Sequence, residues 1–407
     1  MIEGKKLQRH KIWIVKHVGL THFFCSPHAL RSTCTLSASS VSLQAWGSLL
    51  RKSLYGFVLL FFCFIPYSFA MSDGYENTLT QELTKEEFED SVISYINNER
   101  SFKGLLPLVK DELARNVAYD HANNLVKMQY LSFINQSDQG PDERYTIRGG
   151  TGVVTETIKG FENAGNKKIK LTELLIKQLL QAILANPDDS NILFYPYLTN
   201  LGVGYAASER NERFTVVLDF AINVANLKPI KTNIYRGEKI TVTGNIKKPY
   251  KFKAVSIAYY DEFKTSSDTV EETEALYFDN ESIKPYLLPQ DYIAFGDKSK
   301  NNFLNVLKGL GVISAIGAAP FTGGATAILA PPLLSSIQNG APREIPLKSG
   351  FKVAASGDFT GQVDLNYEGM SGLYFVSVIA EAPGINFPLV VSRRTVRVGQ
   401  PSVAKIK

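Results

Sequence analysis

The segment from Tyr130 to Ile158, YLSFINQSDQGPDERYTIRGGTGVVTETI, is polar and rich in turn residues, and it contains no histidine and no cysteine. It offers carboxylates, amides, hydroxyls and arginines, which suit the recognition of a polar ligand or partner. Arg144 and Arg148 are its candidate ligand-binding cations. The motif RGGTG at 148–152 lacks the spacing and the following Lys-Ser/Thr of a phosphate-binding loop, so it predicts a turn. We expect the segment to be a loop that leads from a helix to a short extended stretch and shapes a surface.

An export signal precedes these residues. In LLRKSLYGFVLLFFCFIPYSFAMSDG, two basic residues at 51–52 are followed by an apolar run at 54–65 and a small-x-small cleavage site at 68–70. This pattern predicts a signal peptide at 51–70 that is cut after Ala70, the alternative being a signal anchor that stays uncut. Residues 1–50 lie upstream of it and are either an over-extended translation start or a long n-region. We leave them out of the fold.

Removal of the leader limits the chemistry of the remaining chain. All three cysteines and four of the five histidines precede Met71, so the exported chain has one histidine, His121, and cannot form a disulfide. It cannot assemble a Cys/His zinc site or a Cys–His dyad. Eight of the 44 Lys/Arg and one of the 39 Asp/Glu also precede Met71, which leaves 36 basic and 38 acidic residues. This balance gives no reason to expect a nucleic acid partner.

The elements that position the polar residues follow from periodicity. A capping box, TKEE at 84–87, starts a helical region that runs to about 130, with an interruption at KGLLPL and a second helix from about Asp111. His121 lies on or near the apolar face of this second helix, where a packed, hydrogen-bonded histidine is expected. A third helix is predicted at 171–185. Two strands, from Leu201 and from Arg213, then form a hairpin, which completes an α+β unit at 80–225.

From Lys228 onward the chain changes to short alternating runs with turn residues between them, which predicts an all-β, Ig-like sandwich at 228–400. An apolar Gly/Ala-rich insertion at 300–345 interrupts it, and no charge occurs between Lys308 and Arg343. Its central part, 309–337, is either a hairpin packed against one of the domains, a membrane-inserting or oligomerising hairpin, or a disordered segment.

The first of these domains resembles a known family. YINNERSFKGLLPLVKDELARNVAYDHANNLVKM, TETI at 155–158 and NPDDSNIL…LGVGYA at 186–206 occur in the order of the blocks of the bacterial CAP/SCP (cysteine-rich secretory protein/pathogenesis-related) superfamily. The resemblance covers about 84–225. It implies an α-β-α sandwich with a central cleft, where many relatives hold two histidines and acidic residues that can bind a divalent metal.

Several cleft positions depart from the family pattern. Phe133 stands near the first expected histidine, and Asp188 or Asp189 stands at the second. Glu156 matches the cleft glutamate, although the family's following Asn is Thr157. Together, Glu156 and Asp188 or Asp189 allow three interpretations: a helix-stopping turn with a structural glutamate, an all-oxygen calcium or magnesium site, or a general acid–base pair.

The sequence thus predicts an exported binding protein without catalytic residues, metal or other cofactor, located in the periplasm, on the cell surface or secreted. Its expected partner is an envelope or extracellular protein or a polysaccharide. The alternatives are a carboxylate-based hydrolase, possibly assisted by a divalent cation, and a membrane-interacting protein that acts through 309–337. Glu156, Asp188, Asp189, Arg144 and Arg148 are the candidate ligand-binding residues.

Overall fold

The computed structural model describes residues 79–162, 169–209, 212–260, 278–297, 345–383 and 389–399. The expected signal peptide, the residues upstream of it and the apolar segment 309–337 lie outside these ranges. The described residues all belong to the unit that runs from Met71 to Lys407. No helix in the described part of the chain combines the length and apolar character needed to cross a membrane.

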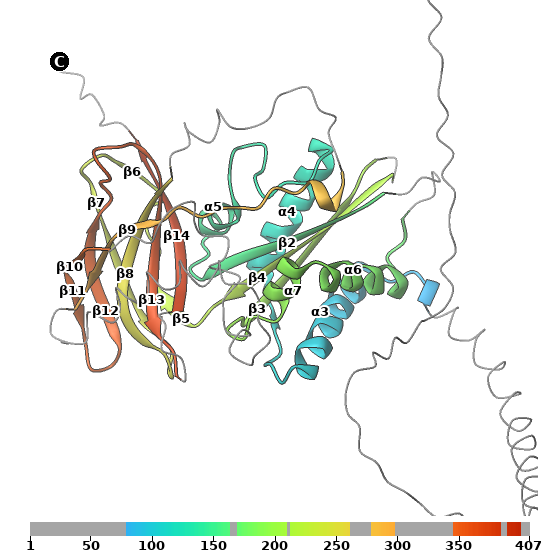
Figure 1. Ribbon diagram of the computed structural model, residues 1–407, viewed down its shortest axis with the longest axis horizontal. Helices are drawn as coiled ribbons and strands as arrows, with labels where there is room; N and C mark the ends of the chain where they lie inside the picture. The colour runs from blue at the N-terminus through green and yellow to red at the C-terminus, as the bar shows by residue number, and fades with distance from the viewer. Residues whose placement is uncertain are drawn as a thin grey trace, which may run out of the picture. The chain divides into compact units, whose positions relative to one another are not determined.

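The first half of the described chain folds as helices on both faces of a sheet (Figure 1). The helices begin where the sequence supplies caps: Thr84 and Glu87 form the predicted capping box, and Asp111 and Thr172 accept hydrogen bonds from the first turns of their helices. The helices are α3 (Lys85–Phe102), α4 (Glu112–Met128), α5 (Pro141–Ile147), α6 (Glu173–Ala185) and α7 (Pro187–Leu193). The sheet has the order β1-β3-β4-β2 and consists of β1 (Val109–Lys110), β2 (Val153–Glu162), β3 (Asn200–Ala207) and β4 (Arg213–Ile222).

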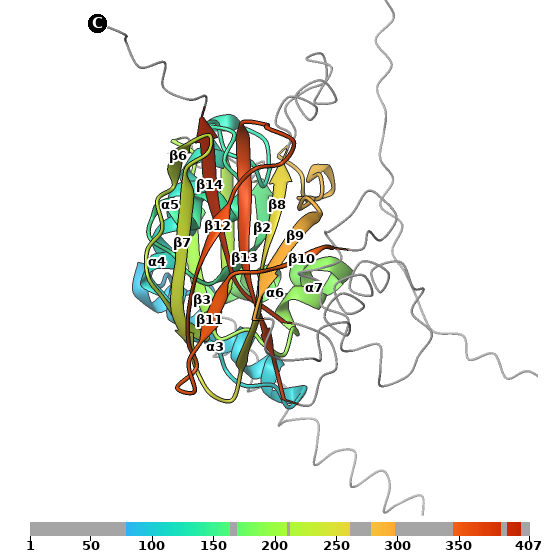
Figure 2. The same cartoon turned by 90° about the vertical axis from the view of Figure 1, so that its left-hand side faces the viewer.

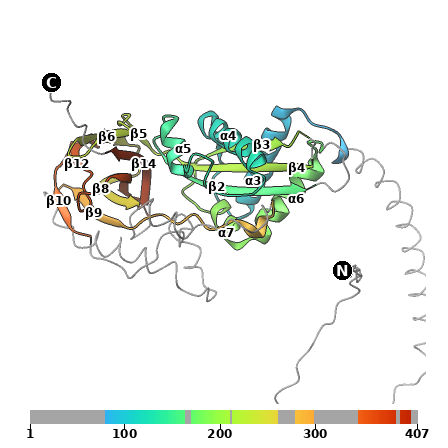
Figure 3. The same ribbon diagram turned by 90° about the horizontal axis from the view of Figure 1, so that it is seen from above.

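Side-chain alternation divides this sheet between two cores. Even-numbered residues of β2, such as Ile158, pack with α4 residues such as Ala118 and Leu125, whereas even-numbered residues of β4 pack with α3 and α6. Figure 3 shows α4 and α5 on one side of the sheet and α6 and α7 on the other. A Cβ on Gly204 would lie 2.1 Å from a backbone nitrogen of α4, so only glycine permits this close helix–strand approach. The GVG motif is therefore a packing feature of a strand.

The second half of the described chain forms two further sheets, which are seen face-on in Figure 2. The six-stranded sheet β10-β9-β8-β13-β14-β6 packs on the four-stranded sheet β11-β12-β7-β5 through apolar side chains, among them Phe252 and Phe359, whose rings stack at 4.2 Å. The strands are β5 (Ala225–Leu227), β6 (Asn233–Tyr235), β7 (Lys239–Ile246), β8 (Lys251–Tyr260), β9 (Asp291–Gly296), β10 (Leu347–Ser349), β11 (Phe351–Val353), β12 (Asp358–Asp364), β13 (Gly372–Glu381) and β14 (Leu389–Gly399); a 3-10 turn, η1 (Asn280–Ser282), precedes β9.

The predicted mixed α and β class is confirmed. Strands from both sides of the insertion share sheets: β8 pairs with β13, and β7 pairs with β12. One local prediction is wrong, because the segment 130–158 is not simply a loop with a short extended end. It contains the helix α5, and it enters the ten-residue strand β2.

Candidate functional site

A group of buried polar side chains occupies the α4/α5 face of the first sheet. His121 comes from α4, Arg144 from α5, Glu156 from β2 and Asp219 from β4. Glu156 and Asp219 are directly opposite each other in the antiparallel β2–β4 register, so their side chains lie on the same face as near neighbours. All four residues are buried. This group is the candidate site.

Glu156 is held by an arginine. Its Oε2 accepts a hydrogen bond of 2.7 Å from Nη2 of Arg144, and the glutamate side chain is 0% exposed. Nη1 of Arg144 donates to the carbonyl oxygens of Phe133 at 2.8 Å and Gln139 at 2.6 Å. The guanidinium therefore fixes the preceding loop and the glutamate at the same time. Charge-assisted contacts of this kind are short and directional.

His121 is neutral in this environment. Its Nε2 donates to the carbonyl oxygen of Ser132 at 2.8 Å and lies 3.5 Å from Oε1 of Glu156. Burial lowers the pKa of His121 to about 4, because the imidazolium would lose its hydration; the neighbouring Glu156 raises this pKa and the nearby Arg144 lowers it. The other ring nitrogen, Nδ1, has no hydrogen-bond partner in the described part of the chain. The histidine thus serves as a packed donor, as its helix position predicts.

Asp219 was not predicted as a site residue, and it is fully buried beside Glu156. Burial raises the pKa of Asp219 well above its usual value, and the charge of Glu156 raises it further. Among the described residues no donor bonds to either Asp219 oxygen, yet Glu156 lies within hydrogen-bond reach of this carboxyl group. A proton on Asp219 accounts for both observations, because a carboxylic acid can donate to Glu156, whose Oε1 otherwise receives no hydrogen bond. The sequence did carry a signal: an aspartate interrupts the apolar strand RFTVVLDFAIN.

Two further acids on α5 lie at the contact with β14. Asp142 is buried, and burial raises its pKa to about 6, while Arg393 and Arg144 lower it. Glu143 accepts two hydrogen bonds from Arg397, at 2.6 and 3.0 Å. The backbone of β14 also bonds to this region, since the Arg393 nitrogen donates to the Gly152 carbonyl at 3.1 Å. The helix that positions Arg144 is thus anchored on the second half of the chain.

The two expected cleft aspartates lie elsewhere. Asn186 caps α7 by accepting from the backbone nitrogens of Asp188 and Asp189, so NPDD both ends α6 and begins α7. Asp188 is exposed, whereas Asp189 is buried and forms an ion pair with Lys159. Lys159 is odd-numbered in β2 and Glu156 is even-numbered, so these side chains point to opposite faces of the sheet. The structure does not bring Glu156 together with Asp188 or Asp189, which corrects the expected carboxylate pair.

The two candidate arginines also differ from expectation. Arg144 is buried in the ion pair with Glu156 and does not present a charge at a surface. Arg148 is exposed and forms an ion pair with the exposed Asp120 of α4. Of the five residues predicted from the sequence, the structure therefore joins only Arg144 and Glu156.

The donors on this face do not fit a divalent cation. One oxygen of Glu156 is engaged by Arg144, and Phe133 supplies no ligand atom where the resemblance expects a histidine. Asp189 lies across the sheet with Lys159 as its own cation. In the described ranges, no three His, Cys, Asp or Glu residues are grouped as a metal site would require. The Glu156–Asp219 pair could share a proton, but a reaction would need solvent or substrate to reach it, and both side chains are buried.

Solved structures similar to this chain include an outer surface protein and an extracellular protein. No protein-family model and no curated protein matches the chain. An outer surface protein from Borrelia burgdorferi is similar at 15% identity and a TM-score of 0.29, over 35% of this chain and 96% of that one. An extracellular protein containing an SCP domain from Bacillus anthracis is similar at 18% identity and a TM-score of 0.26, over 34% of this chain and 44% of that one.

Proposed function

We propose that the chain is an exported, non-catalytic binding protein that combines a degenerate CAP domain, at about 84–225, with an Ig-like sandwich. The leader at 51–70 supports export, and the three sequence blocks in family order support the CAP assignment. The helices on both faces of the first sheet agree with the α-β-α arrangement that the resemblance implies. The proposed partner is an envelope or extracellular protein or a polysaccharide.

The residues that carry the resemblance have structural roles in this chain. The Asn97 amide exchanges two hydrogen bonds with the backbone of Leu108, at 2.7 and 3.0 Å. The buried Arg100 donates to the carbonyl oxygens of Leu106, Leu193 and Tyr195. These side chains tie the end of α3 to the loop before β1 and to the end of α7. Such contacts explain why a scaffold can persist after its cleft ligands have been replaced.

The burial of Glu156 is the observation that carries the non-catalytic assignment. A general base must reach the proton that it removes, directly or through one water molecule. Glu156 is 0% exposed, and its carboxylate is paired with Arg144 at 2.7 Å. His121 is neutral and already donates to Ser132. The two groups best suited to acid–base chemistry are therefore engaged in holding the interior together.

The test compares binding with turnover in the chain that begins at Met71. Purified protein is titrated with the isolated envelope of its source cells, with and without EDTA, alongside Glu156→Gln. Glu162→Gln is the matched control, because Glu162 lies on the same strand, where its exposed carboxylate contacts Arg213 at 3.3 Å. We expect saturable binding that is insensitive to EDTA and equal in the two variants when both are folded.

Three results would contradict the proposal. The first is an absence of binding to the envelope. The second is hydrolysis of envelope material that is lost in Glu156→Gln and kept in Glu162→Gln. The third is a tightly held transition metal whose removal abolishes an activity, because the described residues supply no suitable ligand set for it.

A further inference from the structure

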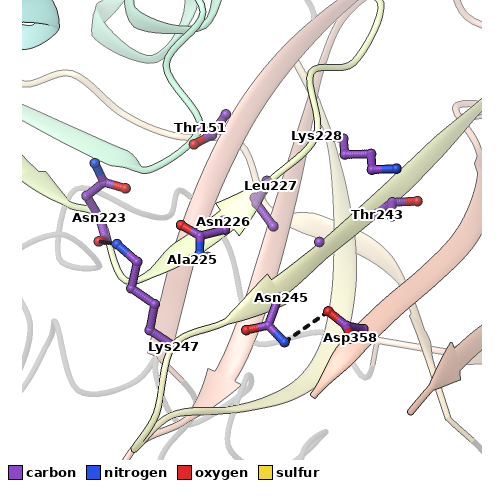
Figure 4. Close-up of a pocket in the computed structure, with 11 residues that line it drawn as sticks. Thr151, Asn223, Ala225, Asn226, Leu227, Lys228, Thr243, Asn245, Lys247 and Asp358 are labelled. Carbon is purple, nitrogen blue, oxygen red and sulfur yellow. Dashed lines mark hydrogen bonds between the residues drawn. The ribbon is translucent and has the colours of Figure 1, made fainter. Parts of the chain in front are cut away.

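A polar pocket of about 690 Å³ opens on the outer face of the four-stranded sheet, apart from the buried candidate site. Strands β5, β7 and β12 form its floor, and Thr151 and Asn223 come from the neighbouring segments of the first half of the chain (Figure 4). The functional residues discussed above do not line it. Its walls carry amides, hydroxyls, one carboxylate and two ammonium groups, and Leu227 is the large apolar side chain among the lining residues.

Three side chains form a row across the floor of this pocket. The strand registers place Asn226 opposite Asn245, and Asn245 opposite Asp358. Nδ2 of Asn245 donates to Oδ1 of Asp358 at 3.1 Å and to the carbonyl oxygen of Ser356 at 3.3 Å. The amide group is thereby fixed, and its Oδ1 is left as an acceptor. Asp358 also accepts from Oγ of Ser356 at 2.6 Å, and these hydrogen bonds lower the pKa of Asp358, which keeps it ionised.

The row therefore presents fixed acceptors at known spacing. Neighbouring strands lie about 4.8 Å apart, so Asn226, Asn245 and Asp358 repeat at that interval across the sheet. The exposed Asn226 adds a side-chain amide with both donor and acceptor atoms. A surface of this kind suits a ligand with several hydroxyl groups, because each hydroxyl can donate to one atom and accept from another.

Two lysines flank the row, one on each side along the direction of β7. The backbone nitrogen of Lys228 donates to the carbonyl of Thr243, whereas Lys247 directly follows the last residue of β7. Thr243 and Lys247 are four residues apart, which corresponds to about 13 Å along a strand. Figure 4 shows the two ammonium groups on either side of the row. Lys247 donates to the Asn223 carbonyl at 3.3 Å, and Lys228 also lines the pocket.

We propose that this pocket binds an acidic saccharide, such as a uronate-containing glycan. Ring hydroxyls would donate to Asp358 and Asn245, the Asn226 amide would bridge a further hydroxyl, and the sugar carboxylate would pair with Lys228 or Lys247. The two lysines outnumber the single aspartate, and the resulting net positive charge of the pocket favours an acidic ligand over a neutral one. The scarcity of large apolar groups disfavours a protein hot spot. The inference rests on the proposed function and gives its polysaccharide partner a site and a class.

The test titrates the chain that begins at Met71 with a glucuronate-containing disaccharide, a neutral disaccharide of the same linkage and inorganic phosphate. Binding is followed by NMR chemical-shift changes at low and at high salt. We expect weak, saturable binding of the acidic disaccharide, with shifts confined to β5, β7 and β12. Lys247→Gln and Asn245→Ala should each weaken this binding by about fivefold, as expected for the loss of one contact worth ~1 kcal/mol.

Matched controls lie on the same outer sheet face outside the pocket. Lys352→Gln and Gln362→Ala change residues of β11 and β12 and should leave the affinity within about twofold. Equal binding of the neutral disaccharide, binding of phosphate alone, or equal loss in the control variants would overturn the proposal. Envelope binding that persists unchanged in Lys247→Gln and Asn245→Ala would overturn this site while leaving the proposed function intact. Failure of the unaltered chain to bind the envelope would instead overturn the proposed function.

Discussion

Replacement of His121 tests the electrostatics of the candidate site most directly, because it is the one histidine after residue 70. Burial lowers its pKa to about 4. The folded state therefore resists protonation between pH 6.5 and pH 4, whereas the unfolded chain takes up the proton. Since the unfolded state binds more protons in this range, stability is lost as the pH falls from about 6.5 to about 4. Below pH 4 both states are protonated, and the loss is complete.

The size of this effect follows from the two pKa values. The ordinary value of 6.5 and the folded value of about 4 differ by about 2.5 pH units, and at ~1.36 kcal/mol per unit this gives roughly 3 kcal/mol. His121→Gln retains an N–H that can donate to the Ser132 carbonyl but does not titrate. The unfolding free energy of the unaltered chain minus that of His121→Gln should therefore fall by roughly 3 kcal/mol between pH 7 and pH 4.

Urea unfolding of the chain from Met71, measured at half-unit steps from pH 7.5 to pH 3.5, gives this difference directly. An NMR titration of the single imidazole supplies an independent value for its pKa in the folded state. Two results would refute the argument that His121 is held neutral by burial. One is that the unfolding free energies of the two proteins change in parallel with pH across the range, and the other is an imidazole that titrates near 6.5.

Three further substitutions test neighbouring features by urea unfolding. Asp142→Asn should stabilise the protein by roughly 3 kcal/mol at pH 7 and by little near pH 4, because the cost of ionising this buried carboxyl builds up as the pH rises from its ordinary pKa of 3.8 to its folded pKa of about 6 and is complete above that; a pH-independent difference would contradict this. Glu156→Gln should cost roughly 3–5 kcal/mol, because it leaves the buried Arg144 without its counter-charge, whereas Glu162→Gln at the exposed end of the strand should cost below ~1 kcal/mol; equal costs would refute the pairing. Gly204→Ala should destabilise by at least about 1–3 kcal/mol, since its Cβ would lie 2.1 Å from the backbone of α4, and an unchanged midpoint would show that the helix can move away.

Most regular elements could be predicted because their signals are local. The capping box at Thr84 and the apolar periodicity after it predict α3, and alternating residues predict β3, β4 and the longer strands of the sandwich. Helix α5 was missed because seven residues are too few to show a 3.6-residue period. Its start did carry a weak signal, a proline at the first helical position followed by two acidic residues.

The candidate site was harder to predict because its contacts are distant in sequence. Arg144 and Glu156 were both chosen as candidates, but nothing local shows that they pair with each other across 12 residues. The approach of Asp219 to Glu156 depends on the register of β2 and β4, which follows only from the folded sheet. Because side chains alternate along β2, Glu156 and Lys159 point to opposite faces of the sheet. Asp189 pairs with Lys159 because α7 lies on the face to which Lys159 points, and the sequence does not show which face α7 covers.

On the proposed relationship to the CAP family, the departures from its pattern can be understood together. Where the family has its second cleft histidine, this chain has Asp188 or Asp189; Asp189 is buried, and a buried carboxylate needs a cation close by. Lys159 supplies it from the adjacent strand, although burial still raises the pKa of Asp189 above its usual value. On the other face, Arg144 plays the corresponding part for Glu156. Each of these two buried acids therefore has a cation from the chain itself, which balances its charge. A binding role for such a chain must come from its surface, which is where the polar row on β5, β7 and β12 lies.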